Sequence, residues 1–435
     1  MPTISATLAA NEQIRARLAR GERIHHLAFG EAGIPVHPGL AEVLRRATGR
    51  GGYPSVAGDA AARDAVAGYL GRRGLATSHA DPDRVLLAPG SKALLYALLA
   101  VLPGDVVLPQ PSWVSYAAQA ALTGKRVLHV PAPAHAGGVP DPGLLDDALR
   151  AIPASAARRP GILVLTSPDN PTGTVAGESL LRDVCAVAEC HELLIISDQI
   201  YADLTHDGTL PVSPARILPD RVVVTTGLSK SVALGGWRIG AAALPASPLG
   251  LAVRDQLLQV ASEIWSALPG PMQEVAAYAF AEPDELVAHV GQARRLHGAV
   301  ARAVHSLVVD AGARCRPPQG GFYLYPDFSA TNADSAASPS GAGSVDDSAM
   351  LADVLLSAHG IGVLPGSAFG DDPRRLTFRA ATSLLYGVDD DQRWAALRDP
   401  DPVKLPWISD SLDRLRTGFA AFSDRMRRTR HRPET

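Results

Sequence analysis

The sequence predicts an α/β protein built on a mostly parallel β-sheet with helices on both faces. Short apolar runs, typical of buried strands, alternate along the chain with segments of helical periodicity. Polar clusters follow directly after several of these runs, where sheets of this kind gather their ligands. The chain has 435 residues, which is enough for more than one hydrophobic core, so we expect more than one domain.

Six apolar runs are predicted as strands of this sheet. In chain order they are 84–88, 105–108, 126–130, 162–166, 193–197 and 221–225. Helical patterns lie between several of them, for example over 178–192. The longest apolar run, "LLYALLAVL" at 94–102, has the length of a buried helix and is too short to span a membrane.

A second region is predicted from about residue 293, where a long helical pattern begins. Strands are expected around 321–326 and 376–382. The stretch 329–348 between them consists of small, polar, Gly- and Pro-bearing sequence, which is typical of a mobile surface insertion.

Composition excludes several classes of function. The net charge is −3 and no basic stripe alternates with aromatic residues, so we expect no nucleic-acid partner. A cluster of arginines near the C-terminus is predicted to be a solvated helix end or tail: Arg425, Arg427, Arg428, Arg430 and Arg432. With no run of eighteen apolar residues and no secretion signal, we expect a soluble, cytoplasmic protein without a membrane partner.

The three cysteines predict neither a disulfide framework nor a metal site. Cys185 and Cys190 lie in a helical pattern without the spacing of zinc ligands, and we interpret both as packed core residues. Cys315 is isolated in the sequence.

Four polar clusters stand where predicted strands end. They are "PGSK" at 89–92, "SPDNPTG" at 167–173, "DQIY" at 198–201 and "TGLSK" at 226–230. A buried Asp198 would need a cationic partner, because an unpaired carboxylate in an apolar interior is costly. The amine of Lys230 at a strand end could attack a carbonyl carbon.

The same edge of the sheet offers groups that bind an anion. Residues 90–92 open a predicted helix, whose backbone N–H groups suit a phosphate. Ser229 and Arg238 could add a hydroxyl and a bidentate guanidinium to it. A lysine, a carboxylate and a phosphate cradle together match a ligand with an aldehyde, a protonatable ring nitrogen and a phosphate, which describes pyridoxal 5′-phosphate (PLP).

The chain resembles the class I/II aminotransferase family, the aspartate-aminotransferase-like enzymes of fold type I, over nearly its whole length. The matching segments come in the family's order: "FGEAG" at 29–33, "YPSVAG" at 53–58, "PGSKALLYAL" at 89–98, "PSWVSY" at 111–116, "PDNPTG" at 168–173, "SDQIYADL" at 197–204, "SKSVALGGWRIG" at 229–240, "PGSAFG" at 365–370 and "FRAATS" at 378–383. The spacing of Asp198, Tyr201, Lys230 and Arg238 is the most specific part of the match.

The resemblance implies roles for the residues around the cofactor ring. Lys230 would form the internal aldimine with PLP and then carry the proton between the substrate Cα and C4′. Asp198 would pair with the pyridinium nitrogen. Asn170 and Tyr201 would hydrogen-bond the 3′ oxygen, and Trp113 would stack on the ring face.

It also implies a phosphate site, a substrate site and a second subunit. The phosphate would be held by Gly90, Ser91, Lys92, Ser229 and Arg238. Tyr53 would reach the phosphate of the neighbouring subunit, which implies a homodimer. Arg379 would bind the substrate carboxylate, in a pocket lined by Gly30, Trp113 and Asn170. We prefer Arg379 to Arg375 because it lies inside an apolar strand, where a charge needs a reason.

The implied fold has a large domain with a mostly parallel seven-stranded sheet between helices. A smaller α+β domain would form from the N- and C-terminal segments. The expected division is an N-terminal arm over 1–45, a PLP-binding domain over 46–292, and a small domain over 293–435 that contains the insertion at 331–347. The chain departs from many relatives at Gln199, where they carry glutamate, and at 235–236, where Gly-Gly replaces Pro-Gly.

The implied function is transfer of an amino group from an amino acid to a 2-oxo acid by a ping-pong mechanism. We expect a small or apolar amino donor, since no second arginine can be placed opposite Arg379. One alternative is a PLP-dependent lyase or a biosynthetic tailoring enzyme, because this fold hosts several reactions. Another is a non-catalytic PLP-binding regulatory module, although only about 25 residues precede "HLAFG", too few for a DNA-binding domain.

Overall fold

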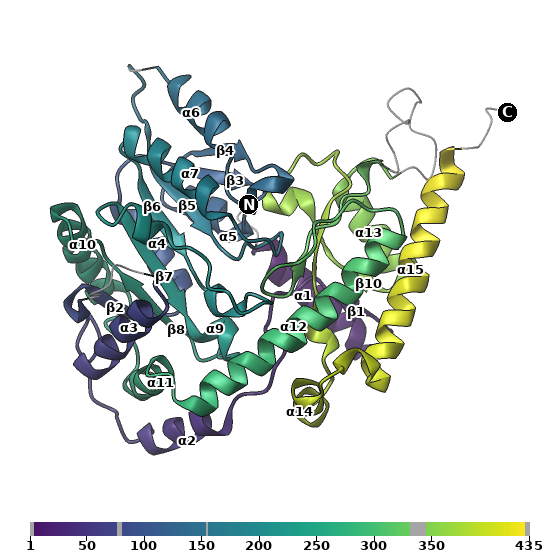
Figure 1. The fold of residues 1–435 in the computed structure, drawn as a ribbon, viewed down its shortest axis with the longest axis horizontal. Coiled ribbons are helices and arrows are strands. Elements are labelled where there is room, and N and C mark those ends of the chain that lie inside the picture. Colours follow the sequence, from purple (N-terminus) through teal and green to yellow (C-terminus); the bar gives the residue numbers. More distant parts are fainter. Residues whose placement is uncertain (1–3, 76–80, 154, 331–344, 431–435) are drawn as a thin grey trace.

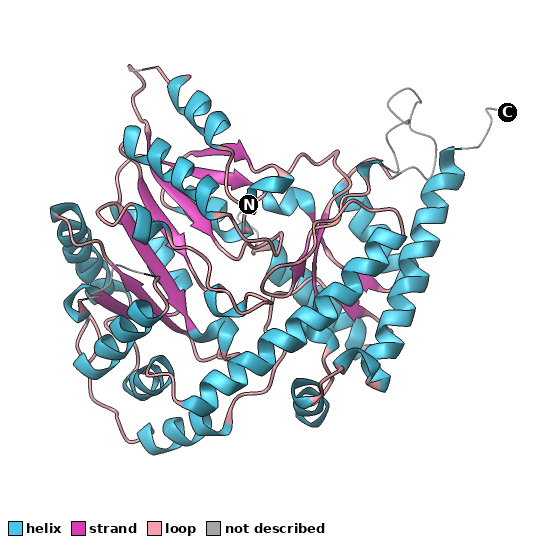
Figure 2. Ribbon diagram, viewed as in Figure 1, coloured by secondary structure: helices cyan, strands magenta, loops and turns pink. Residues whose placement is uncertain are grey.

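The computed structural model describes residues 4–75, 81–153, 155–330 and 345–430. A central sheet flanked by helices forms the larger half of the molecule, and a smaller half carries the last helix, α15 (Pro406–Arg430) (Figures 1 and 2). Over the described ranges, no helix combines the length and the apolar character that crossing a membrane requires.

The larger half contains a seven-stranded sheet, as the resemblance implied. Its strand order is β2 (Val85–Pro89), β8 (Ile239–Ala243), β7 (Val222–Gly227), β6 (Leu194–Asp198), β5 (Pro160–Thr166), β3 (Asp105–Gln110) and β4 (Val127–Pro131). The six predicted strands are confirmed within one or two residues at their ends. The sequence analysis missed β8, whose alanine-rich segment runs antiparallel to both of its neighbours.

Both faces of this sheet are buried, which explains why its strands are apolar without interruption. In β5, Ile162 and Val164 join a cluster with the helices α4 (Ser91–Val101), α5 (Val114–Leu122) and α10 (Pro248–Ile264). The alternate residues of β5, Leu163 and Leu165, join the cluster on the opposite face, which includes α3 (Ala60–Arg72), α6 (Pro142–Arg150), α7 (Glu178–Cys190) and α11 (Gly270–Phe280). Packing on both faces fixes the strands, and with them the positions of the side chains at their carboxyl ends.

The smaller half combines the two ends of the chain. Its antiparallel sheet has the order β11 (Leu364–Pro365), β12 (Phe378–Ala381), β9 (Tyr323–Leu324). Near the N-terminus, α1 (Ala6–Ala19) leads to β1 (His25–His26), which pairs in parallel with β10 (Ile361–Gly362). The helices α13 (Ser348–His359) and α14 (Asp390–Arg398) complete this half with α15.

One long helix joins the two halves. The helix α12 (Asp284–Asp310) contacts the short helix η3 (Ala202–Leu204) of the larger half and α15 of the smaller one. It begins before residue 293, where the sequence suggested the second region. The helix α2 (Pro38–Ala47) packs against α11 and so lies with the larger half.

The structure bears on the predicted insertion and on the predicted burial of two cysteines. The predicted insertion at 331–347 falls mostly on 331–344, outside the described residues, whereas Val345 is buried and Asp347 caps α13 by accepting a bond from the Met350 N–H. The prediction that both clustered cysteines are core residues is wrong for Cys190. Cys185 is buried in α7, but Cys190 ends that helix on its exposed side.

Candidate active site

Asp198 lies at the carboxyl end of β6, between polar residues of both neighbouring strands. The strand register pairs it with Thr166 of β5 and Thr225 of β7. Its carboxylate accepts hydrogen bonds from the Tyr116 hydroxyl at 2.9 Å and the Thr225 hydroxyl at 3.2 Å. Burial raises the pKa of Asp198 to about 6, although these hydroxyls, the Ile200 N–H and the charge of Lys230 favour the anion. No cation bonds this carboxylate within the described ranges, so it is suited to a positively charged N–H donor.

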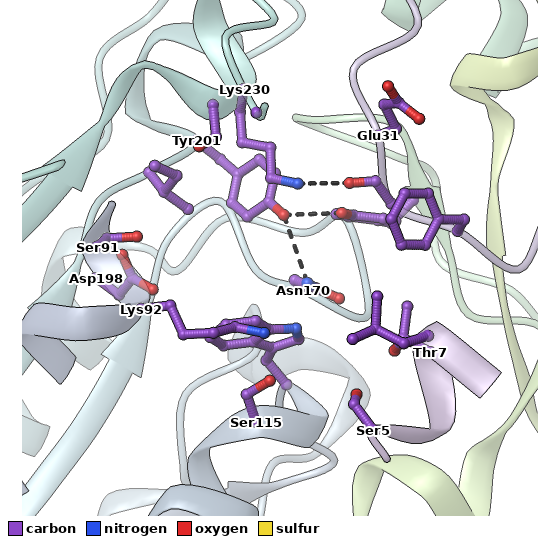
Figure 3. Close-up of a pocket in the computed structure, with 18 of the residues that line it drawn as sticks. Ser5, Thr7, Glu31, Ser91, Lys92, Ser115, Asn170, Asp198, Tyr201 and Lys230 are labelled. Atoms are coloured by element: carbon purple, nitrogen blue, oxygen red, sulfur yellow. Dashed lines mark hydrogen bonds between the residues drawn. The ribbon is translucent and has the colours of Figure 1, made fainter. Parts of the chain in front are cut away.

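Lys230 stands at the end of the neighbouring strand. It lies in the short helix α9 (Leu228–Ser231), which follows β7 directly. The Nζ donates a hydrogen bond to the Gly30 carbonyl and lies 5.8 Å from the centroid of the Tyr201 ring (Figure 3). Burial, assisted by the positive charge of Arg379, lowers the pKa of Lys230 to about 8. An appreciable fraction of the amine is therefore neutral near pH 7 and can act as a nucleophile.

A tight turn at the start of α4 has the features of an anion site. Gly90 adopts φ +89, a conformation that favours glycine, and a Cβ atom there would overlap the Arg238 guanidinium. A Cβ atom at Gly240 of β8 would likewise overlap the Ser91 nitrogen. Arg238 donates at 2.8 Å to the Gly235 carbonyl, and no carboxylate pairs with it in the described part of the chain. A guanidinium beside a helix N-terminus matches what a phosphate requires.

Arg379 of β12 is a fully buried arginine without a carboxylate partner among the described residues. It is 1% exposed and donates to Asn170 Oδ1 at 3.0 Å and to the Ala28 carbonyl at 2.7 Å. Its Nε is buried and has no hydrogen-bond acceptor in the described part of the chain, and burial lowers the pKa of the guanidinium. Arg375, by contrast, is half-exposed and pairs with the carboxylates of Asp327 and Asp371 at 2.7 and 3.2 Å. Of these two arginines, Arg379 is the one that can accept a carboxylate ligand.

These groups surround one cavity of about 530 Å³ (Figure 3). Of the residues predicted from sequence, those that line it are Gly30, Ser91, Lys92, Trp113, Asn170, Asp198, Tyr201, Ser229, Lys230, Arg238 and Arg379. Gly90 lies next to it, against Arg238. Tyr53 does not line the cavity, and its side chain is 95% exposed on the single chain.

The cavity also has walls that the sequence analysis missed. Ser5, Thr7, Asn11 and Arg15 reach it from α1 and its N-cap. Of these, Ser5 and Thr7 lie on the side away from Asp198 and Ser91 in Figure 3. The alanine-rich α1 carries no apolar stripe, so nothing in the sequence marked it. Other missed residues carried a signal: Tyr116 follows Trp113 by one helical turn, and Thr166 ends a predicted strand.

Tyr323 is a further missed wall of the cavity. Its hydroxyl bonds that of Tyr201 at 2.8 Å, and its ring lies 4.8 Å from the Arg379 guanidinium carbon. In the sequence it stands in the second region, far from the four polar clusters.

The arrangement fits PLP. Asp198 is a buried carboxylate without a cationic partner among the residues described, and the ring nitrogen of PLP would supply one. The lowered pKa of Lys230 suits attack on an aldehyde, and the turn beside Arg238 is kept clear by two glycines for a phosphate.

Comparison with known proteins identifies relatives that match most of this chain and most of their own length. Residues 35–384 match the model of a family described as aminotransferase class I and II. An aspartate aminotransferase of Geobacillus stearothermophilus is 33% identical over 398 residues, which cover 88% of this chain and 93% of the relative. An aspartate/prephenate aminotransferase of Cereibacter sphaeroides is 31% identical over 397 residues, again 88% of this chain and 93% of the relative.

A solved structure of an aminotransferase has a similar fold over nearly the whole chain. The aspartate aminotransferase of Thermus thermophilus with maleate superposes with a TM-score of 0.79 at 26% identity, covering 97% of both chains. Since the family match spans most of the sequence and the relatives agree with it in length and fold, this chain belongs to the class I and II aminotransferase family and is a PLP-dependent aminotransferase.

Proposed function

We propose that this aminotransferase takes its amino group from an acidic amino acid, aspartate or glutamate, and that it works as a homodimer in the cytoplasm. The observation that carries the choice of substrate is Lys92. Its Nζ lies on the cavity wall 5.2 Å from the centroid of the Trp113 ring, and no carboxylate pairs with it across the described ranges. Arg238 already places a guanidinium against the phosphate turn, so Lys92 remains to bind a second carboxylate of the substrate.

Two further features support an acidic substrate. The Ser5 and Thr7 hydroxyls line the cavity at the start of α1, and the Thr7 Oγ1 is buried without a partner in the described structure. The relatives reported above are named for aspartate or prephenate, and the Thermus structure is named with maleate, a dicarboxylate. This proposal replaces our expectation of a small or apolar donor, which rested on the lack of a second arginine. It also replaces our expectation that Lys92 holds the phosphate together with Gly90, Ser91, Ser229 and Arg238.

The catalytic roles follow from the positions of the side chains. Bound PLP supplies an aldehyde that accepts the amino group and a ring that withdraws electrons from the substrate Cα. The Asp198 carboxylate would keep a proton on the ring nitrogen. The Lys230 amine would be the covalent anchor and then move a proton between Cα and C4′. The Tyr201 hydroxyl and the Asn170 amide would donate to the 3′ oxygen, with Trp113 against the ring face.

Arg379 would hold the α-carboxylate through its planar guanidinium. Its fixed bonds to Asn170 and Ala28 orient that plane before a ligand arrives. The same contact serves the amino acid and the 2-oxo acid, as a ping-pong reaction requires. Gly30, beside Lys230, would border the substrate and leave room for it.

The dimer is proposed from Tyr53. A large aromatic side chain that is 95% exposed suits a contact with a second copy of the chain, where it would reach the partner's phosphate site. Gly51 and Gly52 before it have open space around them. Three free cysteines suit a reducing compartment such as the cytoplasm. We also propose the division into a PLP-binding domain over 46–292 and a small domain built from 1–45 and 293–435, except that α2 belongs with the PLP-binding domain because it packs against α11.

A panel of amino donors tests the substrate. Aspartate, glutamate, alanine, leucine and phenylalanine would each be added to the PLP form, with loss of cofactor absorbance and 2-oxo acid release as readouts. Lys92→Gln should lower kcat/KM for aspartate at least tenfold more than for alanine, and Lys404→Gln, at an exposed lysine, is the control. An equal loss for all donors, together with weaker PLP binding, would assign Lys92 to the phosphate. Release of ammonia would show that the enzyme catalyses elimination rather than amino-group transfer.

A further inference from the structure

Tyr323 connects the two sides of the proposed active site. It comes from β9 of the smaller half, whereas Tyr201 follows β6 of the larger half. Their hydroxyl oxygens are 2.8 Å apart, and both side chains are buried. The two rings meet edge to face, with centroids 5.5 Å apart. A short bond between two buried phenols fixes the position of each oxygen.

The direction of this bond follows from the role proposed for Tyr201. Its oxygen also receives the Asn170 Nδ2 donor at 3.4 Å. A phenol has one proton and two lone pairs, so Tyr201 can give its proton to an anionic oxygen in the cavity only if Tyr323 is the donor in their mutual bond. Donation from Tyr323 makes Tyr201 a stronger donor in turn, because hydrogen bonds in a chain polarise one another.

The ring of Tyr323 serves Arg379. The guanidinium carbon lies 4.8 Å from the ring centroid, within the range of a cation–π contact. The partners of Arg379 in the described structure are otherwise two uncharged oxygens and the Phe369 ring, whose centroid is 5.0 Å away. Aromatic rings therefore hold the plane of a guanidinium that has no carboxylate to orient it.

The position of Tyr323 is itself fixed from both halves. Its backbone pairs with Ala381, two residues after Arg379 on β12. Two residues before it, Gly321 donates its N–H to the Leu204 carbonyl, and its own carbonyl accepts a bond from His206 Nε2 at 2.8 Å. On the cavity side, a Cβ atom at Gly30 would overlap the Tyr323 hydroxyl, so that hydroxyl lies directly against the backbone that receives Lys230.

We propose that Tyr323 is a positioning residue for the transfer reaction, with its hydroxyl holding the Tyr201 phenol and its ring holding the Arg379 guanidinium. One side chain thereby sets the spacing between the group that tunes the cofactor and the group that orients the substrate carboxylate. The inference rests on the roles proposed above for Tyr201 and Arg379.

Two substitutions separate the hydroxyl from the ring. Tyr323→Phe removes the donor to Tyr201 and keeps the ring. Tyr201 then donates more weakly to the 3′ oxygen, more negative charge stays on that oxygen, and the absorbance of the bound cofactor should titrate about half a pH unit higher or more. The KM for the best amino donor should change less than threefold. Tyr323→Leu removes the ring too, and should also raise that KM about tenfold.

Tyr325→Phe is the matched control. It removes a hydroxyl two residues away, which bonds Asp371 and Thr377 and does not line the cavity. It should leave the titration and the KM unchanged, even where thermal melting shows a loss of stability. An unchanged titration in Tyr323→Phe, or an unchanged KM in Tyr323→Leu, would overturn the inference.

Two parallel variants separate this failure from a failure of the proposed function. Tyr201→Phe should shift the titration further than Tyr323→Phe does, and Arg379→Lys should raise the KM further than Tyr323→Leu does. If these two variants behave like the wild type, the roles of Tyr201 and Arg379 fail and the positioning role of Tyr323 fails with them. If they respond and the Tyr323 variants do not, only the inference about Tyr323 is wrong.

Discussion

Replacing Arg379 by lysine is the most informative single perturbation of the site. Lysine keeps the positive charge and much of the side-chain volume but loses the planar fork. In this structure the fork donates to Asn170 Oδ1 and the Ala28 carbonyl, and the buried Nε has no acceptor among the described residues. A lysine cannot keep both fixed bonds and also bind a carboxylate through two parallel N–H donors.

The expected loss follows from those bonds. A hydrogen bond to a charged group contributes about 1.5–3 kcal/mol, and the substitution removes one such bond to the substrate and one that orients the side chain. A net loss of about 3 kcal/mol corresponds to about 100-fold in kcat/KM. Arg375→Lys is the matched control, because that arginine is half-exposed and paired with Asp327 and Asp371. Arg375 does not line the cavity, and a lysine keeps its positive charge beside Asp327 and Asp371, so the effect on kcat/KM should stay below about fivefold.

Single-turnover absorbance measurements would follow each half-reaction separately. The amino acid is mixed with the PLP form and the 2-oxo acid with the aminated form, at several concentrations for each variant. Both halves should slow in Arg379→Lys, since donor and acceptor present the same carboxylate. A large effect of Arg375→Lys with none for Arg379→Lys would show that the carboxylate site lies four residues earlier. A loss confined to one half-reaction would show that the two substrates do not share this contact.

The remaining predictions concern the cofactor and the dimer. Lys230→Ala should abolish turnover with the fold intact by circular dichroism, and borohydride should no longer fix cofactor to the chain; retained covalent cofactor would place the anchor elsewhere. Asp198→Ala should lower kcat by orders of magnitude while PLP still binds in part through the phosphate turn, and near-normal turnover would contradict the assignment. In the cofactor-free protein, the pKa of Asp198 is raised to about 6 from 3.8, so the stability that this group contributes is present below about pH 4 and is lost as the pH rises through 6. Asp198→Asn should remove this pH dependence of the unfolding free energy. In denaturant melts above pH 6 it should stabilise the cofactor-free protein by on the order of 2–3 kcal/mol, and an unchanged pH dependence would show that the carboxylate is not the cause. Tyr53→Ala should weaken PLP binding and leave the large-domain fold intact, and a wild type that sediments as a monomer with full activity would refute the dimer.

Much of the fold could be predicted because its signals are local. The sheet strands are continuous apolar runs, and the polar residues at their ends stand next to them in sequence, as Asp198 and Lys230 do. The strand β8 was missed because Ile239–Ala243 is mostly alanine and glycine, which have little strand preference of their own. It forms because its two neighbours present unpaired edges on either side.

The missed walls of the cavity depend on contacts between distant segments. The residues of α1 reach the site only because β1 pairs with β10, whose residues come 336 positions later in the chain. Tyr323 faces Tyr201 only because its strand pairs with β12 and the preceding glycine turn bonds the Leu204 carbonyl. No short-range pattern encodes either contact. For Tyr53 the situation is reversed. A sequence motif suggested its role, but the structure of a single chain does not contain the partner subunit whose phosphate site it would contact.

The reversed strand β8 also restricts which sequences this protein could explore in a laboratory mutagenesis library. It presses the Gly240 backbone against the Gly90–Ser91 turn, so a methyl group at either position meets a neighbouring segment rather than solvent. The two glycines are 150 positions apart in the chain, yet a compensating change in a side chain cannot relieve the overlap at Gly240, because the atoms in the way belong to the backbone. In a library randomised at position 90 or 240, most variants would therefore fail to form the turn at Gly90–Ser91. Diversity aimed at new substrates belongs at Ser5, Thr7 and Arg15, whose side chains border the cavity from a separate helix.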